Sequence, residues 1–95
     1  QLKKLERQKQ EYLENKQKQY RSKEQRAADA RRRARIKELE QEIEAAEIAI
    51  FKLEQEIQEP EITSDFSLMS EKCTQLENLR TQLDEKMDEW AALEE

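Results

Sequence analysis

The sequence predicts an all-α protein, built as a two-helix antiparallel coiled-coil hairpin with a long N-terminal helical extension. Charged residues make up 43% of the 95 residues, glycine is absent and proline occurs once, a composition typical of long helices. Two stretches repeat apolar residues at alternating steps of three and four, the spacing of a helix that packs along one partner helix. The single proline lies between these stretches, where a hairpin needs its turn.

The first apolar repeat predicts the first helix of the hairpin. It consists of Ile36, Leu39, Ile43, Ala46, Ile50, Leu53 and Ile57. Pro60 disfavours helical backbone at Glu59, so this helix should end at about residue 58. A polar turn is expected over 59–64. Ser64 is the predicted N-cap of the next helix, because its hydroxyl can accept a hydrogen bond from a backbone N–H.

The second apolar repeat predicts a helix over about 65–94. It consists of Met69, Cys73, Leu76, Arg80, Leu83, Met87 and Trp90, and Leu79 and Leu93 widen it on one flank. Because the connection is short, the two helices should be antiparallel. The expected register pairs Ile57 with Met69 beside the turn, and Ile36 with Trp90 at the open end, where the indole would cover the seam. Cys73 is expected to be a small core residue, since a lone cysteine on the seam needs no reactive role.

Residues 1–35 are predicted to form a basic helical lead-in continuous with the first helix, and residues 36–95 to form the hairpin. The stretch 21–35 is rich in good helix formers and has no helix breaker. Farther upstream, Leu2, Leu5, Tyr12, Leu13 and Tyr20 are too sparse for a sustained seam. About the first twenty residues should therefore either fray or pair with a second copy in a homodimer.

Charge is divided unevenly along the chain. Residues 1–37 contain 14 Lys and Arg against 5 Asp and Glu, a net +9, whereas residues 38–95 contain 4 against 18, a net −14. The densest basic cluster is the candidate nucleic-acid site: Arg21, Lys23, Arg26, Arg31, Arg32, Arg33, Arg35 and Lys37. These cations would neutralise phosphates of DNA or ribosomal RNA, and they would equally suit a solvated helix surface that balances the acidic hairpin.

The sequence argues against several classes of protein. Without glycine it has no phosphate-binding loop or nucleophile elbow, and without histidine it lacks the commonest zinc ligand, so no catalytic residue, cofactor site or metal site is predicted. The alternating carboxylates Glu38, Glu40, Glu42 and Glu44 do not share a helix face. No apolar run has the length of a membrane span, and one cysteine is compatible with a reducing compartment. A soluble, cytoplasmic chain without a membrane partner is expected.

Several short motifs, in their order, resemble a known family. They are YLENK at 12–16, SKEQR at 22–26, RIKELE at 35–40, EPEI at 59–62 with SDF at 64–66, and EWAAL at 89–93. Together they resemble the C-terminal extension of ABC-F proteins, the twin-cassette ATPases that include relatives of the Uup type and Gram-positive ABC-F factors. The resemblance covers nearly the whole chain.

This resemblance implies a non-catalytic positioning or binding module. The parent would be an ATPase that uses ATP and magnesium in cassettes outside this chain. Partners implied for the module are those cassettes and either DNA or ribosomal RNA, in translation or in DNA-linked processes, with no individual binding residue carried over from the family. The alternative function is a structural coiled-coil spacer or dimerisation module that does not bind nucleic acid.

Overall fold

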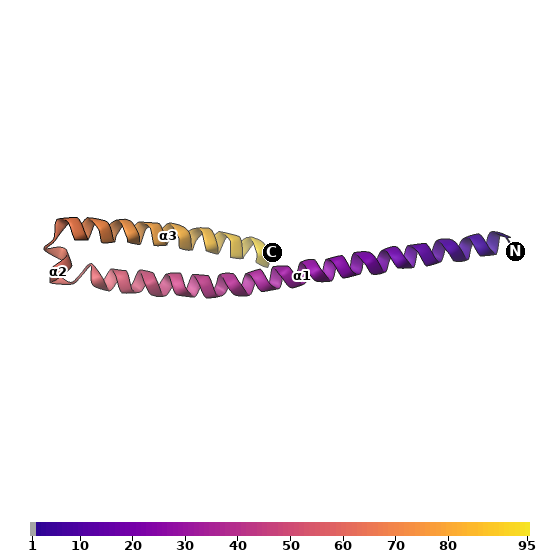
Figure 1. Cartoon of the computed structure of the whole chain (residues 1–95), viewed down its shortest axis with the longest axis horizontal. Coiled ribbons are helices and arrows are strands. Elements are labelled where there is room, and N and C mark those ends of the chain that lie inside the picture. The colour runs from indigo at the N-terminus through magenta and orange to yellow at the C-terminus, as the bar shows by residue number, and fades with distance from the viewer. Residues whose placement is uncertain (1) are drawn as a thin grey trace. The chain divides into compact units, whose positions relative to one another are not determined.

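The residues that the structure describes form two long helices and a short helix that lies between them in the chain. The structure, a computed structural model, describes residues 2–95, with the side chain of Arg21 excepted. Helix α1 spans Leu2–Glu56, α2 spans Pro60–Thr63 and α3 spans Phe66–Glu94 (Figure 1). Residues 2–95 contain no strand. The prediction of an all-α coiled-coil hairpin is confirmed.

The chain divides into two compact units, Gln1–Ala34 and Arg35–Glu95. In the first unit the described residues form part of α1 alone. In the second unit α3 returns antiparallel to the segment of α1 that begins at Arg35, and α2 lies at the connection between them (Figure 1). The second unit is therefore the hairpin, and α1 provides one of its two long helices.

The face of α1 that packs in the hairpin is the predicted one. Leu39, Ala46 and Leu53 are buried, and Leu39 has no exposed surface. The four isoleucines of the repeat, at 36, 43, 50 and 57, alternate with these residues along the chain and are half-buried. Isoleucines and leucines at these steps form one continuous stripe on a helix, so this segment has only one face that can be removed from water. The predicted seam of the first helix is confirmed.

The packing face of α3 differs from the predicted one by a small rotation. Leu76 is buried, but Arg80 and Met87, which were expected on the seam, are exposed. The half-buried positions along this part of the helix are instead Leu79, Leu83, Lys86, Trp90 and Leu93. With this rotation, α3 covers two leucines in place of an arginine and a methionine, so more apolar surface is removed from water. Lys86 fits there because its aliphatic stem can cover the seam while its ammonium group reaches solvent.

The connection is more ordered than the polar turn expected from the sequence. α1 ends at Glu56, and the backbone N–H groups of Gln58 and Glu59 donate to the carbonyls of Gln55 and Glu56. Pro60 then begins α2, where its fixed φ suits the first helical position and its missing N–H removes no hydrogen bond. The four-residue α2 reverses the chain within residues predicted to be a turn.

The N-cap of α3 is Asp65, and the prediction of Ser64 was wrong. Ser64 has helical backbone angles, φ −83° and ψ −9°, because its N–H closes α2 by donating to the carbonyl of Pro60. An N-cap requires extended backbone, which Asp65 has at φ −112° and ψ 101°. The Asp65 carboxylate accepts a hydrogen bond of 3.1 Å from the Leu68 N–H.

Replacing the Asp65 cap is expected to destabilise the hairpin. Asp65→Ala leaves the Leu68 N–H without its acceptor, at a cost of about 1 kcal/mol in the free energy of unfolding. Urea denaturation followed by circular dichroism measures this difference. Ser64→Ala is the matched control and should change stability by less than about 0.5 kcal/mol, as at most exposed sites. A larger cost for Ser64→Ala than for Asp65→Ala would contradict the assignment.

Candidate nucleic-acid interface

The basic residues of the first unit lie on an exposed stretch of α1. Arginine and alanine dominate this stretch, and both are good helix formers. The side chains of Lys23, Arg26, Arg31, Arg32 and Arg33 are exposed. We call these five residues the basic segment. Arg21, the other predicted residue of this unit, has its side chain outside the described residues.

The basic segment presents cations on two sides of the helix. At 3.6 residues per turn, Lys23, Arg26 and Arg33 fall on one side, and Arg31 and Arg32 fall on the other. The carboxylates between Lys23 and Arg33 are Glu24 and Asp29, so the segment keeps a positive excess. Guanidinium groups can grip phosphates through two parallel hydrogen bonds, and two-sided charge suits a helix that lies between phosphate backbones.

Arg35, in the second unit, is engaged by carboxylates. Its Nε and Nη2 donate to the two carboxylate oxygens of Glu89 at 2.6 and 3.1 Å, a bidentate contact between α1 and α3. Its Nη1 lies 3.3 Å from Glu38 and 3.4 Å from Glu42. These contacts give Arg35 a structural role across the hairpin. Lys37 is exposed and belongs to this second unit.

The Arg35–Glu89 contact shifts the pKa values of both partners. The hydrogen bond to Glu89 raises the pKa of Arg35 further above its usual range, and the hydrogen bond from Arg35 lowers the pKa of Glu89. Nearer the turn, Lys72 donates to Glu56 at 2.8 Å, and this contact raises the pKa of Lys72. Both pairs join α1 to α3. Arg35 and Glu89 directly precede Ile36 and Trp90, the two residues predicted to face each other at the open end of the hairpin.

Acidification is expected to remove the contribution of Glu89 to hairpin stability. Its pKa is lower in the folded chain than the ordinary 4.5, so the stabilisation is complete above that value and is lost as the pH falls below it. The Glu89→Gln variant lacks the contact at every pH. The difference in urea midpoint between the natural chain and this variant should therefore shrink as the pH falls from 7 to below 4.5.

Glu44→Gln, at an exposed glutamate on α1, controls for the general loss of negative charge. A Glu89→Gln difference that stays constant across the pH series would show that Glu89 does not stabilise the hairpin through its ionised carboxylate.

Trp90 lies half-buried near the open end of the hairpin, as predicted. Its indole Nε1 donates to Glu40 at 3.2 Å, and the two residues line a shallow groove with Ile43 and Met87. This hydrogen bond could not be predicted from residue spacing, because Glu40 is one carboxylate in a dense acidic run. The half-burial of Trp90 and this bond from α3 to α1 favour a packing role for Trp90.

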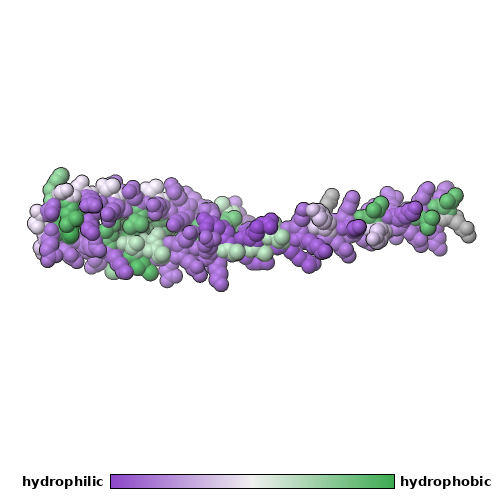
Figure 2. Space-filling view, viewed as in Figure 1, coloured by the Kyte–Doolittle hydropathy of each residue, from purple (hydrophilic) through white to green (hydrophobic). Residues whose placement is uncertain are grey.

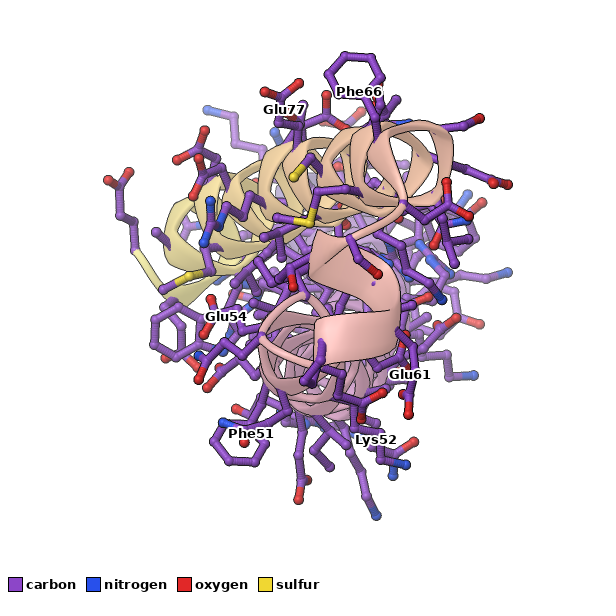
Figure 3. The ribbon with its side chains drawn as sticks, turned by 90° about the vertical axis from the view of Figure 1, so that its left-hand side faces the viewer. Phe51, Lys52, Glu54, Glu61, Phe66 and Glu77 are labelled. Carbon is purple, nitrogen blue, oxygen red and sulfur yellow. The ribbon has the colours of Figure 1, made fainter. Side chains whose placement is uncertain are left out.

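The hairpin exposes aromatic side chains that lie outside both apolar repeats. Phe66 is 89% exposed and Phe51 is 62% exposed. They project to opposite sides of the hairpin, Phe66 from the start of α3 and Phe51 from α1 (Figure 3). Their exposure could have been predicted from their positions outside both apolar repeats.

The remaining sequence predictions concern the cysteine, metal sites and membrane-spanning helices. Cys73 is a free cysteine and is half-buried. Within residues 2–95, no three histidine, cysteine or acidic side chains are grouped so that they could hold a metal ion. In the same part of the chain, none of the helices has the length and apolarity needed to cross a membrane.

Comparison with known proteins identifies the class of domain. Residues 19–95 match the ABC transporter C-terminal domain. The match includes the whole hairpin and all five residues of the basic segment. The chain therefore belongs to the ABC transporter C-terminal domain family. The resemblance to the C-terminal extension of ABC-F ATPases is confirmed at the level of this family. No curated protein and no solved structure gives a significant match.

Proposed function

We propose that this chain is a non-catalytic positioning module of an ABC-F type ATPase, and that it contacts nucleic acid through the basic segment. The observation that carries the proposal is the exposure of Lys23, Arg26, Arg31, Arg32 and Arg33 on a single helix. Contact of this kind would depend on phosphate charge and would tolerate changes in base sequence. Membership of a family of domains attached to ABC proteins supports the positioning role.

The acidic hairpin restricts where nucleic acid can bind. Residues 38–95 carry a net charge of −14, so phosphates should be repelled from most of the hairpin and directed to the lead-in. Arg35 is left out of the proposed surface because its guanidinium donors already contact Glu89 and Glu42. DNA and ribosomal RNA remain the two candidate ligands, and a cytoplasmic location fits either of them. The parent protein would use ATP and magnesium in its own cassettes, outside this chain.

Fluorescence anisotropy tests the proposal. Labelled duplex DNA, single-stranded DNA and an RNA hairpin are titrated with the chain over a salt series. We expect binding at low salt, with log K falling linearly with log salt. On duplex DNA the slope should be no steeper than about −4.5 if all five cations engage, at about 0.9 per phosphate. If none of the three probes binds at low salt, the nucleic-acid function is rejected.

The alternative is a spacer or dimerisation module without nucleic-acid binding. It is favoured by the exposed apolar residues of the first unit, which include Leu5, Tyr12 and Leu13. Sedimentation equilibrium over a concentration series distinguishes the two functions. Concentration-dependent dimers without nucleic-acid binding would support the alternative, whereas a monomer at every concentration would remove dimerisation.

A further inference from the structure

One face of the helix in the first unit carries large apolar side chains that are open to solvent. Leu2, Leu5, Tyr12, Leu13 and Tyr20 are each between 52% and 79% exposed. At 3.6 residues per turn they fall within about 100° of helix surface, the width of a stripe that packs on a partner. We call these five residues the Leu–Tyr face. Figure 2 shows hydrophobic side chains on the surface of this unit, separated by hydrophilic ones.

Two shallow grooves lie along this face, and each includes a lysine. The first is lined by Leu5, Gln8, Lys9, Tyr12 and Leu13, and the second by Leu13, Lys16, Gln17 and Tyr20. Lys9 and Lys16 are two helical turns apart, about 10.5 Å along the axis, in the middle of the stripe. The lining residues include no carboxylate. The surface that covers the Leu–Tyr face must therefore be apolar and must supply acidic partners for both lysines, because a buried unpaired charge is costly.

A second copy of the helix is a poor match for this surface. In a homodimer through the Leu–Tyr face, Lys9 and Lys16 of both copies would enter one interface whose grooves contain no carboxylate. Like charges at such a seam oppose association. Nucleic acid also fits poorly, since Leu5 and Leu13 offer nothing to a phosphate or a base edge. Leucine and tyrosine together are typical of a protein interface.

The position of the face in the chain indicates which protein covers it. The family match begins at residue 19 and describes a C-terminal domain, so Leu2, Leu5, Tyr12 and Leu13 lie on the N-terminal side of the matched domain. That side leads toward the rest of an ABC protein. We infer that the Leu–Tyr face docks on the ABC body of the same polypeptide, on an apolar surface that places carboxylates opposite Lys9 and Lys16. This inference rests on the attachment in the proposed function and not on nucleic-acid contact.

Hydrogen exchange followed by mass spectrometry tests the inference. Peptides covering residues 2–20 are compared in the complete polypeptide and in the 95-residue chain, both without nucleic acid. Docking should slow amide exchange in these peptides at least about tenfold in the complete polypeptide, because an isolated helix opens readily. Leu13→Ala with Tyr20→Ala should remove that protection without unfolding the helix, since alanine is the best helix former. Lys9→Glu with Lys16→Glu should weaken it as well.

Phe51→Ala is the matched control, because Phe51 is as exposed as the Leu–Tyr residues but lies on the hairpin. It should leave the protection of residues 2–20 unchanged. Three results would overturn the inference: equal exchange in both proteins, protection of the 95-residue chain that disappears on dilution, or protection that requires added nucleic acid. If a separate anisotropy titration detects no nucleic-acid binding, the nucleic-acid contact in the proposed function is rejected, and the docking inference is unaffected.

Discussion

Replacing Arg31, Arg32 and Arg33 together by glutamate is expected to reduce nucleic-acid affinity at low salt at least about 100-fold. The three side chains are exposed, and they make up most of the charge of the basic segment. If they contact duplex phosphates, their loss should also reduce the slope of log K against log salt by about 2.7. The helix should persist, because glutamate is a good helix former. Anisotropy titrations at several salt concentrations measure both quantities.

Two further variants make this result specific. Replacing the same three arginines by lysine keeps the charge, so a moderate loss of affinity would indicate bidentate contacts that only guanidinium makes. Lys52→Glu reverses an exposed cation on the hairpin, which points away from it in Figure 3, and should leave affinity nearly unchanged. Equal affinity of the triple glutamate variant and the natural chain would show that the basic segment is not the site.

The packing of α1 could be predicted from the sequence, because only one face of this helix carries the apolar repeat. Ile36, Leu39, Ile43 and the residues that follow form a single stripe, and most residues on the opposite face are charged or polar. No rotation of this helix would bury comparable apolar surface. Burial was therefore decided by residue type and spacing alone.

The repeat of α3 was ambiguous, because two phases share Leu76, Leu83 and Trp90. One adds Arg80 and Met87, and the other adds Leu79, Lys86 and Leu93. Choosing between them requires comparing the apolar area of the leucines with that of an arginine stem. The rotation of α3 also depends on how it packs against α1. The structure selects the leucines. The same limit applies to the N-cap, where Ser64 and Asp65 are both good cap residues and only the backbone of α2 decides between them.

The candidate site was predictable as a charge density and not as a set of contacts. Counting cations located the basic segment, but it could not separate Arg35 from its neighbours. That separation depends on Glu89, which is distant in sequence and reaches Arg35 only in the register of the folded hairpin. The Trp90–Glu40 hydrogen bond was hidden for the same reason. Pairing between side chains on two helices depends on register and rotamer, which residue spacing does not specify.

The largest effect on stability is expected from Leu39→Ala. Leu39 has no exposed surface, so its truncation leaves a cavity in a seam only two helices wide. The expected cost is about 2–5 kcal/mol in the free energy of unfolding. A folded unit of this size has little stability to spare, because it buries a small fraction of its surface. Urea denaturation followed by circular dichroism, with Trp90 fluorescence as a second probe, measures the change.

Ile48→Ala provides the matched comparison in the same helix and the same unit. Ile48 is 49% exposed, and it lies outside the repeat that faces α3. Its truncation should therefore cost less than about 1 kcal/mol, since little buried volume is lost. Equal costs at the two positions would mean that the seam does not hold the hairpin together, and that α3 packs on another face of α1. A large cost at Leu39 alone would establish that the two helices are held by the alternating repeat, because position on that repeat is the main difference between the two substitutions.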